Sequence, residues 1–180
     1  PIGMEIRAQA FAFASNDEVN NMTFYNYELI NRGTQTLYNT YFGFFTDGAL
    51  GDPYDDYVGC DVNRGLGYYY NGDNYDGDNS GFKGYGYSQP AVGVDFFEGP
   101  YQDNDGIDNA FGIWDNEALN GIGYGDGVVD NERFGMRRFL YYSNTTNGAN
   151  PNQTDPVNAG DYYNYLRGFW KDGTKFVYGG

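Results

Sequence analysis

The sequence contains no histidine, one cysteine and few basic residues, and these absences exclude several classes of function. Without histidine the chain lacks the commonest general base, the Ser-His and Cys-His nucleophile pairs, and the usual ligand of zinc and iron sites. With Cys60 alone, neither an internal disulfide nor a CxxC metal or redox motif can form. Ten Lys and Arg residues against 25 Asp and Glu residues give a formal net charge of −15, which opposes binding to nucleic acid or to an anionic membrane surface.

Long hydrophobic runs are also missing. No apolar stretch could span a bilayer, so we expect no direct membrane insertion, and no Gly-rich phosphate loop of the P-loop type is present. Acidic chains poor in aromatic residues are usually disordered, but this one has 20 Tyr, 14 Phe and 2 Trp. These side chains favour strands and bury large areas, so we expect a folded chain. Because it opens at Pro1 rather than methionine, we expect it to be a piece of a much longer product.

Alternating apolar and aromatic residues predict several strands separated by turns rich in Asn, Asp and Gly. The strands are expected at residues 5–14, 22–30, 36–45, 57–60, 66–71, 91–97 and, where helical and strand patterns compete, 133–142. The turn Asn31-Arg32-Gly33 would join the second and third of these as a hairpin. A short helix is expected at residues 161–170 and one helical turn at 114–119. The pattern is typical of an all-β chain, and we predict a single β-sandwich domain of Ig-like or jelly-roll type over residues 1–180.

Carboxylates gather in four clusters, at residues 47–56, 73–79, 103–109 and 126–132, where glycines, asparagines and tyrosines separate them. Like charges this close repel, and a hard cation with oxygen ligands relieves the repulsion. Calcium accepts six to eight such ligands in loose geometry, whereas magnesium demands near-octahedral geometry and keeps its waters. We therefore predict long calcium-binding loops. The candidate ligands are Asp47, Asp52, Asp55, Asp56, Asp61, Asp73, Asp76, Asp78, Asp103, Asp105, Asp108, Asp126, Asp130 and Glu132.

The clusters are not EF-hand loops. If Asp126 and Gly127 take the fifth and sixth positions of that motif, Ile122 and Tyr124 fall where carboxylates are needed. Any calcium would have to be bound by ligands from separate loops. The first and second clusters could meet if the strands between them pair, and the third and fourth could do likewise. The simpler alternative is that Asp, Asn and Gly are ordinary turn residues of a β protein.

Two other functions remain open from the residues alone. The tyrosines, Trp114 and Trp170 could stack on sugar rings, although most aromatics in alternating strands are core or cross-strand partners. A glycosidase would need two carboxylates about 5–10 Å apart in a cleft. No signature in this sequence chooses such a pair.

Several strings resemble a segment of very large secreted proteins of the Bacteroidetes. They include Asp55-Asp56-Tyr57-Val58-Gly59-Cys60-Asp61 and Tyr70-Asn71-Gly72-Asp73, and the resemblance extends from about Phe11 to Tyr142. It implies export by type IX secretion, a location at the cell surface or outside the cell, and a sorting domain beyond Gly180. It also implies a second cysteine where this chain has Tyr69, so the disulfide partner expected for Cys60 is replaced here.

Together these observations predict a non-catalytic, calcium-stabilised module of an exported surface protein that serves adhesion or surface assembly. Calcium outside cells is millimolar, enough to fill sites with dissociation constants of about 10⁻⁴–10⁻³ M. The expected partners are the type IX secretion machinery during export and surface glycans or other surface proteins afterwards. A carbohydrate-binding module is the alternative, followed by a glycoside hydrolase.

Overall fold

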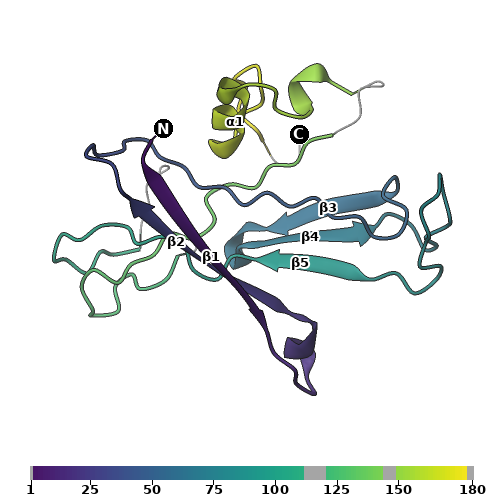
Figure 1. Cartoon of the computed structure of the whole chain (residues 1–180), viewed down its shortest axis with the longest axis horizontal. Helices are drawn as coiled ribbons and strands as arrows, with labels where there is room; N and C mark the ends of the chain where they lie inside the picture. Colours follow the sequence, from purple (N-terminus) through teal and green to yellow (C-terminus); the bar gives the residue numbers. More distant parts are fainter. Residues whose placement is uncertain (1, 112–120, 144–148, 178–180) are drawn as a thin grey trace. The chain divides into compact units, whose positions relative to one another are not determined.

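The computed structural model describes residues 2–111, 121–143 and 149–177 (Figure 1). Contacts within the chain group into two compact units, Pro1–Thr40 and Tyr41–Gly180. The strands form two separate antiparallel sheets, and the described residues include a single α-helix. The chain is therefore mainly β, as the alternation of apolar residues predicts. No helix of the described part is long and apolar enough to cross a membrane.

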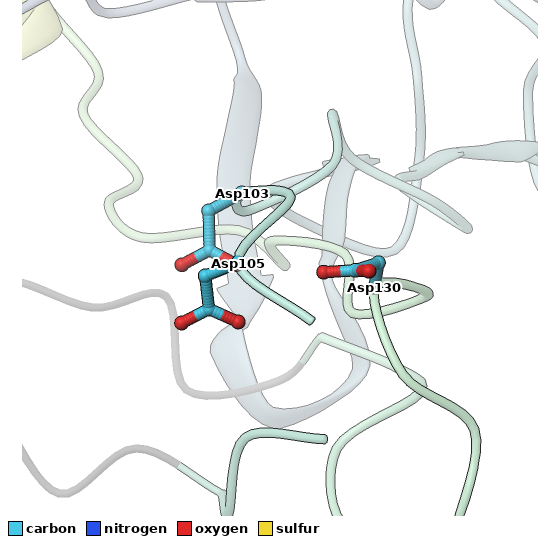
Figure 2. Close-up of side chains that lie close together, drawn as sticks. All are labelled: Asp103, Asp105 and Asp130. Carbon is cyan, nitrogen blue, oxygen red and sulfur yellow. The ribbon is translucent and has the colours of Figure 1, made fainter. Parts of the chain in front are cut away.

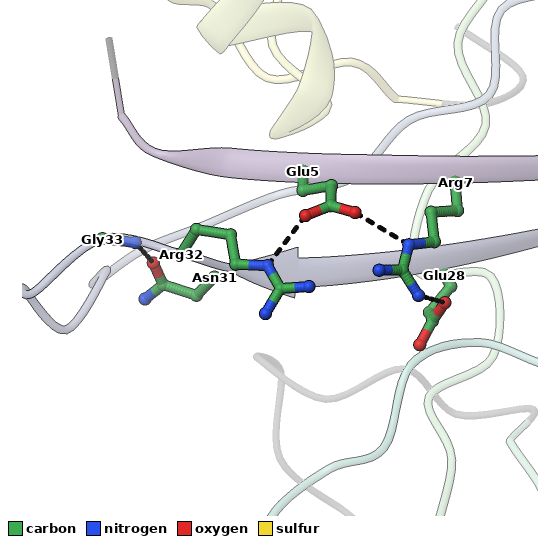
Figure 3. A network of polar contacts seen from close by, with 6 residues as sticks. All are labelled: Glu5, Arg7, Glu28, Asn31, Arg32 and Gly33. Atoms are coloured by element: carbon green, nitrogen blue, oxygen red, sulfur yellow. Dashed lines mark hydrogen bonds and ion pairs between the residues drawn. The ribbon is translucent and has the colours of Figure 1, made fainter.

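The first unit is a two-stranded ribbon of β1 (Met4–Ala12) and β2 (Thr23–Asn31), joined through the short 3-10 helix η1 (Glu18–Asn21). The side chain of Asp17 caps η1 by accepting a hydrogen bond from the Val19 amide. The ribbon has one charged face, where Glu5 accepts hydrogen bonds from both Arg7 and Arg32, each at 2.7 Å (Figure 3). These exposed ion pairs are worth little stability individually.

The opposite face of the ribbon is apolar. Ile6 lies across from Leu29, Ala8 from Tyr27 and Ala10 from Tyr25. Side chains alternate between the faces of a strand, so these residues share one side. That side is largely exposed; Ile6, for example, keeps 61% of its surface accessible.

The hairpin predicted between residues 22–30 and 36–45 is wrong. β2 pairs backward with β1, and residues 36–45 form no strand. The aromatic side chains of that segment have other contacts: Tyr41 packs edge-on against Tyr163, and Phe45 stacks on Tyr142. These aromatic side chains pack on distant rings, and the backbone of the segment forms no ladder.

The second unit contains a three-stranded sheet of β3 (Asp56–Asp61), β4 (Leu66–Asn71) and β5 (Ala91–Asp95), in that order. The three strands predicted here are confirmed, although β5 ends two residues early. β3 and β4 are joined by the 3-10 helix η2 (Val62–Arg64), which Asp61 caps. Tyr69 on one face of the sheet packs near Gly48, so the chain before β3 covers part of that face.

The remaining part of this unit is mostly irregular. The predicted strand at 133–142 is wrong. Within it only Arg133 forms β-bridges, one to Tyr101 and one to Ile122, and neither bridge extends into a ladder. The predicted helix is present as α1 (Ala159–Leu166), which begins after the cap Asn158 and ends before Gly168, where φ is +78°. A 3-10 turn, η3 (Pro151–Gln153), precedes it. The helical turn predicted at 114–119 lies outside the described residues.

The interior of the described chain is unusual in its chemistry. Leu50 is its one hydrophobic residue in the fully buried class, whereas four acidic residues are buried, namely Asp52, Asp76, Glu132 and Asp161. The two largest side chains that are completely enclosed are Glu132 and Asp76. Aspartate and glutamate are almost never fully buried unless they are paired. The partners of these carboxylates therefore decide how the fold is stabilised.

Candidate metal sites

Four carboxylates from the first two clusters come together at the start of β3. We call Asp52, Asp55, Asp56 and Asp76 the first acidic group. Asp76 accepts hydrogen bonds from the backbone amides of Asp52, at 3.0 Å, and Tyr85, at 2.7 Å. Asp56 accepts one from the Leu50 amide at 2.7 Å. The structure thus brings the first and second clusters side by side through the turns that flank the β3–β4 pair.

Glycine makes this arrangement possible. Gly51 has a φ of +72°, a conformation that favours glycine, and it lies against the buried carboxylate of Asp76. A Cβ atom at this position would come within 1.9 Å of Asp76 Oδ2. The turn and the buried carboxylate therefore depend on each other.

No basic side chain among the described residues neutralises the charge of the first acidic group. Burial, followed by the negative charge of Asp52 and Asp76, raises the pKa of Asp55. Burial also raises the pKa of Asp56, with the Leu50 amide acting in the opposite direction and neighbouring aspartates adding to the rise. One oxygen on each of these two side chains is buried and has no hydrogen-bond partner among the described residues. No ion pair to the group exists within the described ranges.

The third and fourth clusters also meet, and we call Asp103, Asp105 and Asp130 the second acidic group. One carboxylate oxygen from each lies within 4.8 Å of the other two, and Figure 2 shows the side chains of Asp103 and Asp105 on one loop near that of Asp130 on another. Ligands at 2.3–2.6 Å from one calcium ion can be separated by at most about 5 Å. The spacing therefore suits a single hard cation. Asp130 has a φ of +58°, a conformation few residues other than glycine adopt.

Glu132 joins the two loops that carry this group. Its backbone carbonyl accepts a hydrogen bond from the amide of Gln102 at 2.9 Å, and its Oε1 accepts one from the amide of Asn109 at 2.5 Å. It therefore binds the residue before the 103–108 loop and the residue after it. The side chain is only 1% exposed, and Oε2 has no hydrogen-bond partner in the described structure. No described Lys or Arg forms an ion pair with it.

Several of the predicted ligands make the hydrogen bonds of ordinary turns. Asp61 caps η2 and pairs with Arg64, and Asp73 accepts the amide of Tyr75 two residues on. Asp126 accepts the amide of Val128, again two residues on, and the side-chain amide of Asn131. Asx turns of this kind are the simpler interpretation of acidic loops.

Three further candidates lie apart from both groups or are already paired. Both oxygens of Asp108 accept backbone amides, from Gly125 and Gly127. Asp78 forms an ion pair with Lys83, whose ammonium lowers the pKa of the carboxyl. Asp47 is exposed on the segment before β3. These residues therefore contact protein donors or solvent.

Neutral amide oxygens near the groups were not among the predicted ligands. The backbone amides of Gln102 and Asn109 donate to Glu132, and Asn131 precedes it in sequence. Asn71 lies opposite Asp56 at the end of the β3–β4 pair. A side-chain oxygen of each is buried without a hydrogen-bond partner in the described parts of the chain. The side-chain amides of Gln102 and Asn131 donate to Asp103 and Asp126, which fixes their orientation. The alternation of Asp with Asn in the clusters was the available signal, because amide and carboxylate oxygens both bind calcium.

Orphaned oxygen acceptors thus concentrate around the acidic clusters. Buried carbonyl-type oxygens without donors are costly, and a bound cation removes that cost by coordinating them. Comparisons with protein-family models, with curated proteins and with solved structures find no match to this chain. The two acidic groups themselves therefore provide the chemical basis for a functional proposal.

Proposed function

We propose that this chain is a non-catalytic, calcium-stabilised module of a large exported surface protein, folded as a β-sandwich and serving adhesion or surface assembly. The observation that carries the calcium assignment is Glu132, a fully enclosed carboxylate with one unpartnered oxygen, which joins the two loops that bear the second acidic group. A buried carboxylate oxygen without a donor is costly, and a coordinated metal ion removes that cost.

Calcium fits the donor set better than magnesium. The oxygen donors are carboxylates and amides from separate loops, and they include the side chains of Asp103, Asp105 and Asp130. Calcium tolerates such irregular sets of six to eight oxygens, whereas magnesium retains water and requires an octahedron. A structural role follows, because the cation would join loops that the chain otherwise connects by few apolar contacts.

The exported location is supported by the sequence resemblance and by the physical chemistry of the sites. Calcium at about 2 mM exceeds dissociation constants of about 10⁻⁴–10⁻³ M by roughly two- to twentyfold. Binding to the folded state alone would then stabilise it by about 0.6–1.8 kcal/mol for each site. In a calcium-poor compartment this stabilisation would be missing and the carboxylates would repel.

Thermal melting with and without calcium tests the proposal. In 2 mM calcium the melting temperature should exceed that in chelator by several degrees, since a shift of 1 kcal/mol corresponds to about 2–4 °C in a chain of this size. An unchanged melting temperature would show that the acidic groups need no cation. Magnesium at the same concentration should give a smaller increase.

Matched substitutions locate the effect. Asp103→Asn and Glu132→Gln should each reduce the calcium-dependent rise in melting temperature. In chelator, Glu132→Gln should be neutral or stabilising, because it removes a buried charge. Asp73→Asn is the control: asparagine can keep the hydrogen bond to the Tyr75 amide, so calcium dependence should remain as in the parent chain. If all three variants lose the calcium-dependent rise in melting temperature equally, the assignment to the second acidic group is contradicted.

A further inference from the structure

One face of the β3–β4–β5 sheet presents exposed tyrosines between very small residues. Tyr57 lies opposite Tyr70, and Tyr68 lies between Gly59 and Gly93 of the two neighbouring strands. Because side chains alternate along strands, these residues share one side of the sheet. We call Tyr57, Tyr68 and Tyr70 the tyrosine face. The three side chains keep 59%, 36% and 41% of their surface exposed.

The three rings lie next to one another on this face. A Cβ atom on Gly59 would lie 2.4 Å from Tyr68 Cζ, so the hydroxyl end of the Tyr68 ring lies against the backbone of β3. The Tyr68 and Tyr70 rings are 5.9 Å apart and tilted by 38°, while Tyr57 meets Tyr70 edge-on at 6.0 Å. Aromatic ring faces carry partial negative charge and attract cations.

The surroundings of this face are acidic. Four of the 25 acidic residues and two of the ten basic residues lie in residues 1–40, so residues 41–180 carry a formal charge of −13. Asp61, Leu66 and Asp95 form the next row of the same side of the sheet. Asp61 is paired with Arg64 at 3.4 Å, whereas Asp95 is exposed and forms no ion pair with the described residues.

Within the same unit, arginines already use tyrosine rings in this way. The guanidinium carbon of Arg133 lies 3.9 Å from the centre of the Tyr101 ring. Those of Arg137 and Arg167 lie 5.3 and 5.2 Å from the rings of Tyr41 and Tyr163. All three distances fall within the range of a cation–π contact.

We propose that the tyrosine face binds an arginine-bearing segment of a partner protein, with a guanidinium group on the tyrosine rings and a second charged contact at Asp95. The size of the face sets the kind of partner. Five residues along three strands cover roughly 17 by 10 Å, far less than the ~800 Å² that each partner contributes to a standard protein interface. The occupant is therefore a short segment rather than a globular surface. This inference goes beyond calcium binding and uses none of the residues in the two acidic groups.

The test is a titration of the whole chain, in calcium, with the peptide acetyl-Gly-Arg-Gly-Arg-Gly-amide, followed by NMR of the tyrosine ring signals. We expect saturable shifts at Tyr57, Tyr68 and Tyr70 that weaken as salt is added, because exposed charges are screened. Tyr70→Leu should weaken binding about two- to fivefold, whereas Tyr70→Phe should retain it, because the ring and not the hydroxyl binds the cation. Asp95→Asn should also weaken it.

Tyr87→Ala is the matched control, because Tyr87 is 83% exposed and lies outside the sheet. If this variant loses as much affinity as Tyr70→Leu, or if the tyrosine-face signals do not move, the peptide binds the acidic surface diffusely and the proposal is overturned. A neutral oligosaccharide that shifts the same signals while the arginine peptide does not would also overturn it, in favour of sugar binding. Thermal melting with and without calcium is a separate measurement, so the calcium proposal and the arginine-binding proposal can each fail without the other.

Discussion

The backbone amide of Asp52 donates a hydrogen bond to the buried carboxylate of Asp76 at 3.0 Å, which joins two acidic clusters 24 residues apart in sequence. Each side chain also has a further donor: Asn79 binds Asp52, and the Tyr85 amide binds Asp76. Two buried carboxylates are thus connected through backbone groups rather than through basic side chains. Three predictions follow from this chemistry and from the aromatic packing around α1.

Gly51→Ala should destabilise the chain by more than about 2 kcal/mol, because it combines a positive φ with a methyl group 1.9 Å from Asp76 Oδ2. Denaturant unfolding measures this change. Gly173→Ala is the control, since Gly173 has a φ of +81° and no atom within 4 Å of the added Cβ. Its cost should be the backbone strain alone. Equal costs for the two variants would show that the contact with Asp76 is unimportant.

Stability without calcium should rise as the pH falls from neutrality toward the usual aspartate range. The pKa values of Asp55 and Asp56 are raised in the folded chain, first by burial, so the folded state binds protons more tightly than the unfolded state. Stability from a raised carboxyl pKa is lost as pH rises through that pKa. Melting temperatures in calcium-free buffer measure the trend.

Other carboxylates set the lower limit of that trend. Hydrogen bonds lower the pKa of Asp78, from Lys83, and of Asp126, from Asn131. Their contribution is present at neutral pH and is lost below the usual aspartate range, near pH 4. With calcium present the effect of mild acid should be reversed, because protons compete with the cation. A calcium increment that is the same at pH 7 and pH 5 would contradict this mechanism.

Tyr165→Phe should cost about 1 kcal/mol or more, since the Tyr165 hydroxyl donates to the Thr154 carbonyl at 2.5 Å in a half-buried site. Burial, and then the charge of Asp161, raises the pKa of Tyr165 to about 12. In an ultraviolet titration this tyrosine should ionise well above the usual range. Tyr162→Phe, an exposed change on the same helix, is the control and should leave stability unchanged.

The sequence predicts the regular elements better than their partners. The strands of the three-stranded sheet and the helix after Asn158 are recognisable because alternation, turn residues and helical spacing are local signals. The partner of β2 is not a local signal. The segments before and after β2 both read as strands, and the choice between them depends on which side chains face each other in the folded chain. Segment 36–45 is as rich in aromatic residues as a strand would be. Its rings pack on distant residues such as Tyr163 and Tyr142 instead of facing a paired strand.

For the acidic clusters too, the sequence predicts local features but not the contacts between distant residues. That four clusters exist, and that they could combine in pairs, follows from composition and spacing. Which members are enclosed does not, because Asp73 and Asp76 differ by three positions and have opposite exposures. The amide oxygens of Gln102 and Asn71 could not be predicted for a similar reason: their burial is decided by backbone pairing with Glu132 and Asp56.

An interior with Leu50 as its one hydrophobic residue in the fully buried class among the described residues also affects how stability responds to temperature. The heat capacity of unfolding comes from the exposure of apolar surface, and exposure of polar surface reduces it. A chain that encloses carboxylates and leaves most aromatics half-exposed should therefore have a heat capacity change below the usual ~12–15 cal/mol/K per residue. Its free energy of unfolding then curves only gently with temperature, and the folded state persists over a broad range of cold conditions even where its maximum stability is modest.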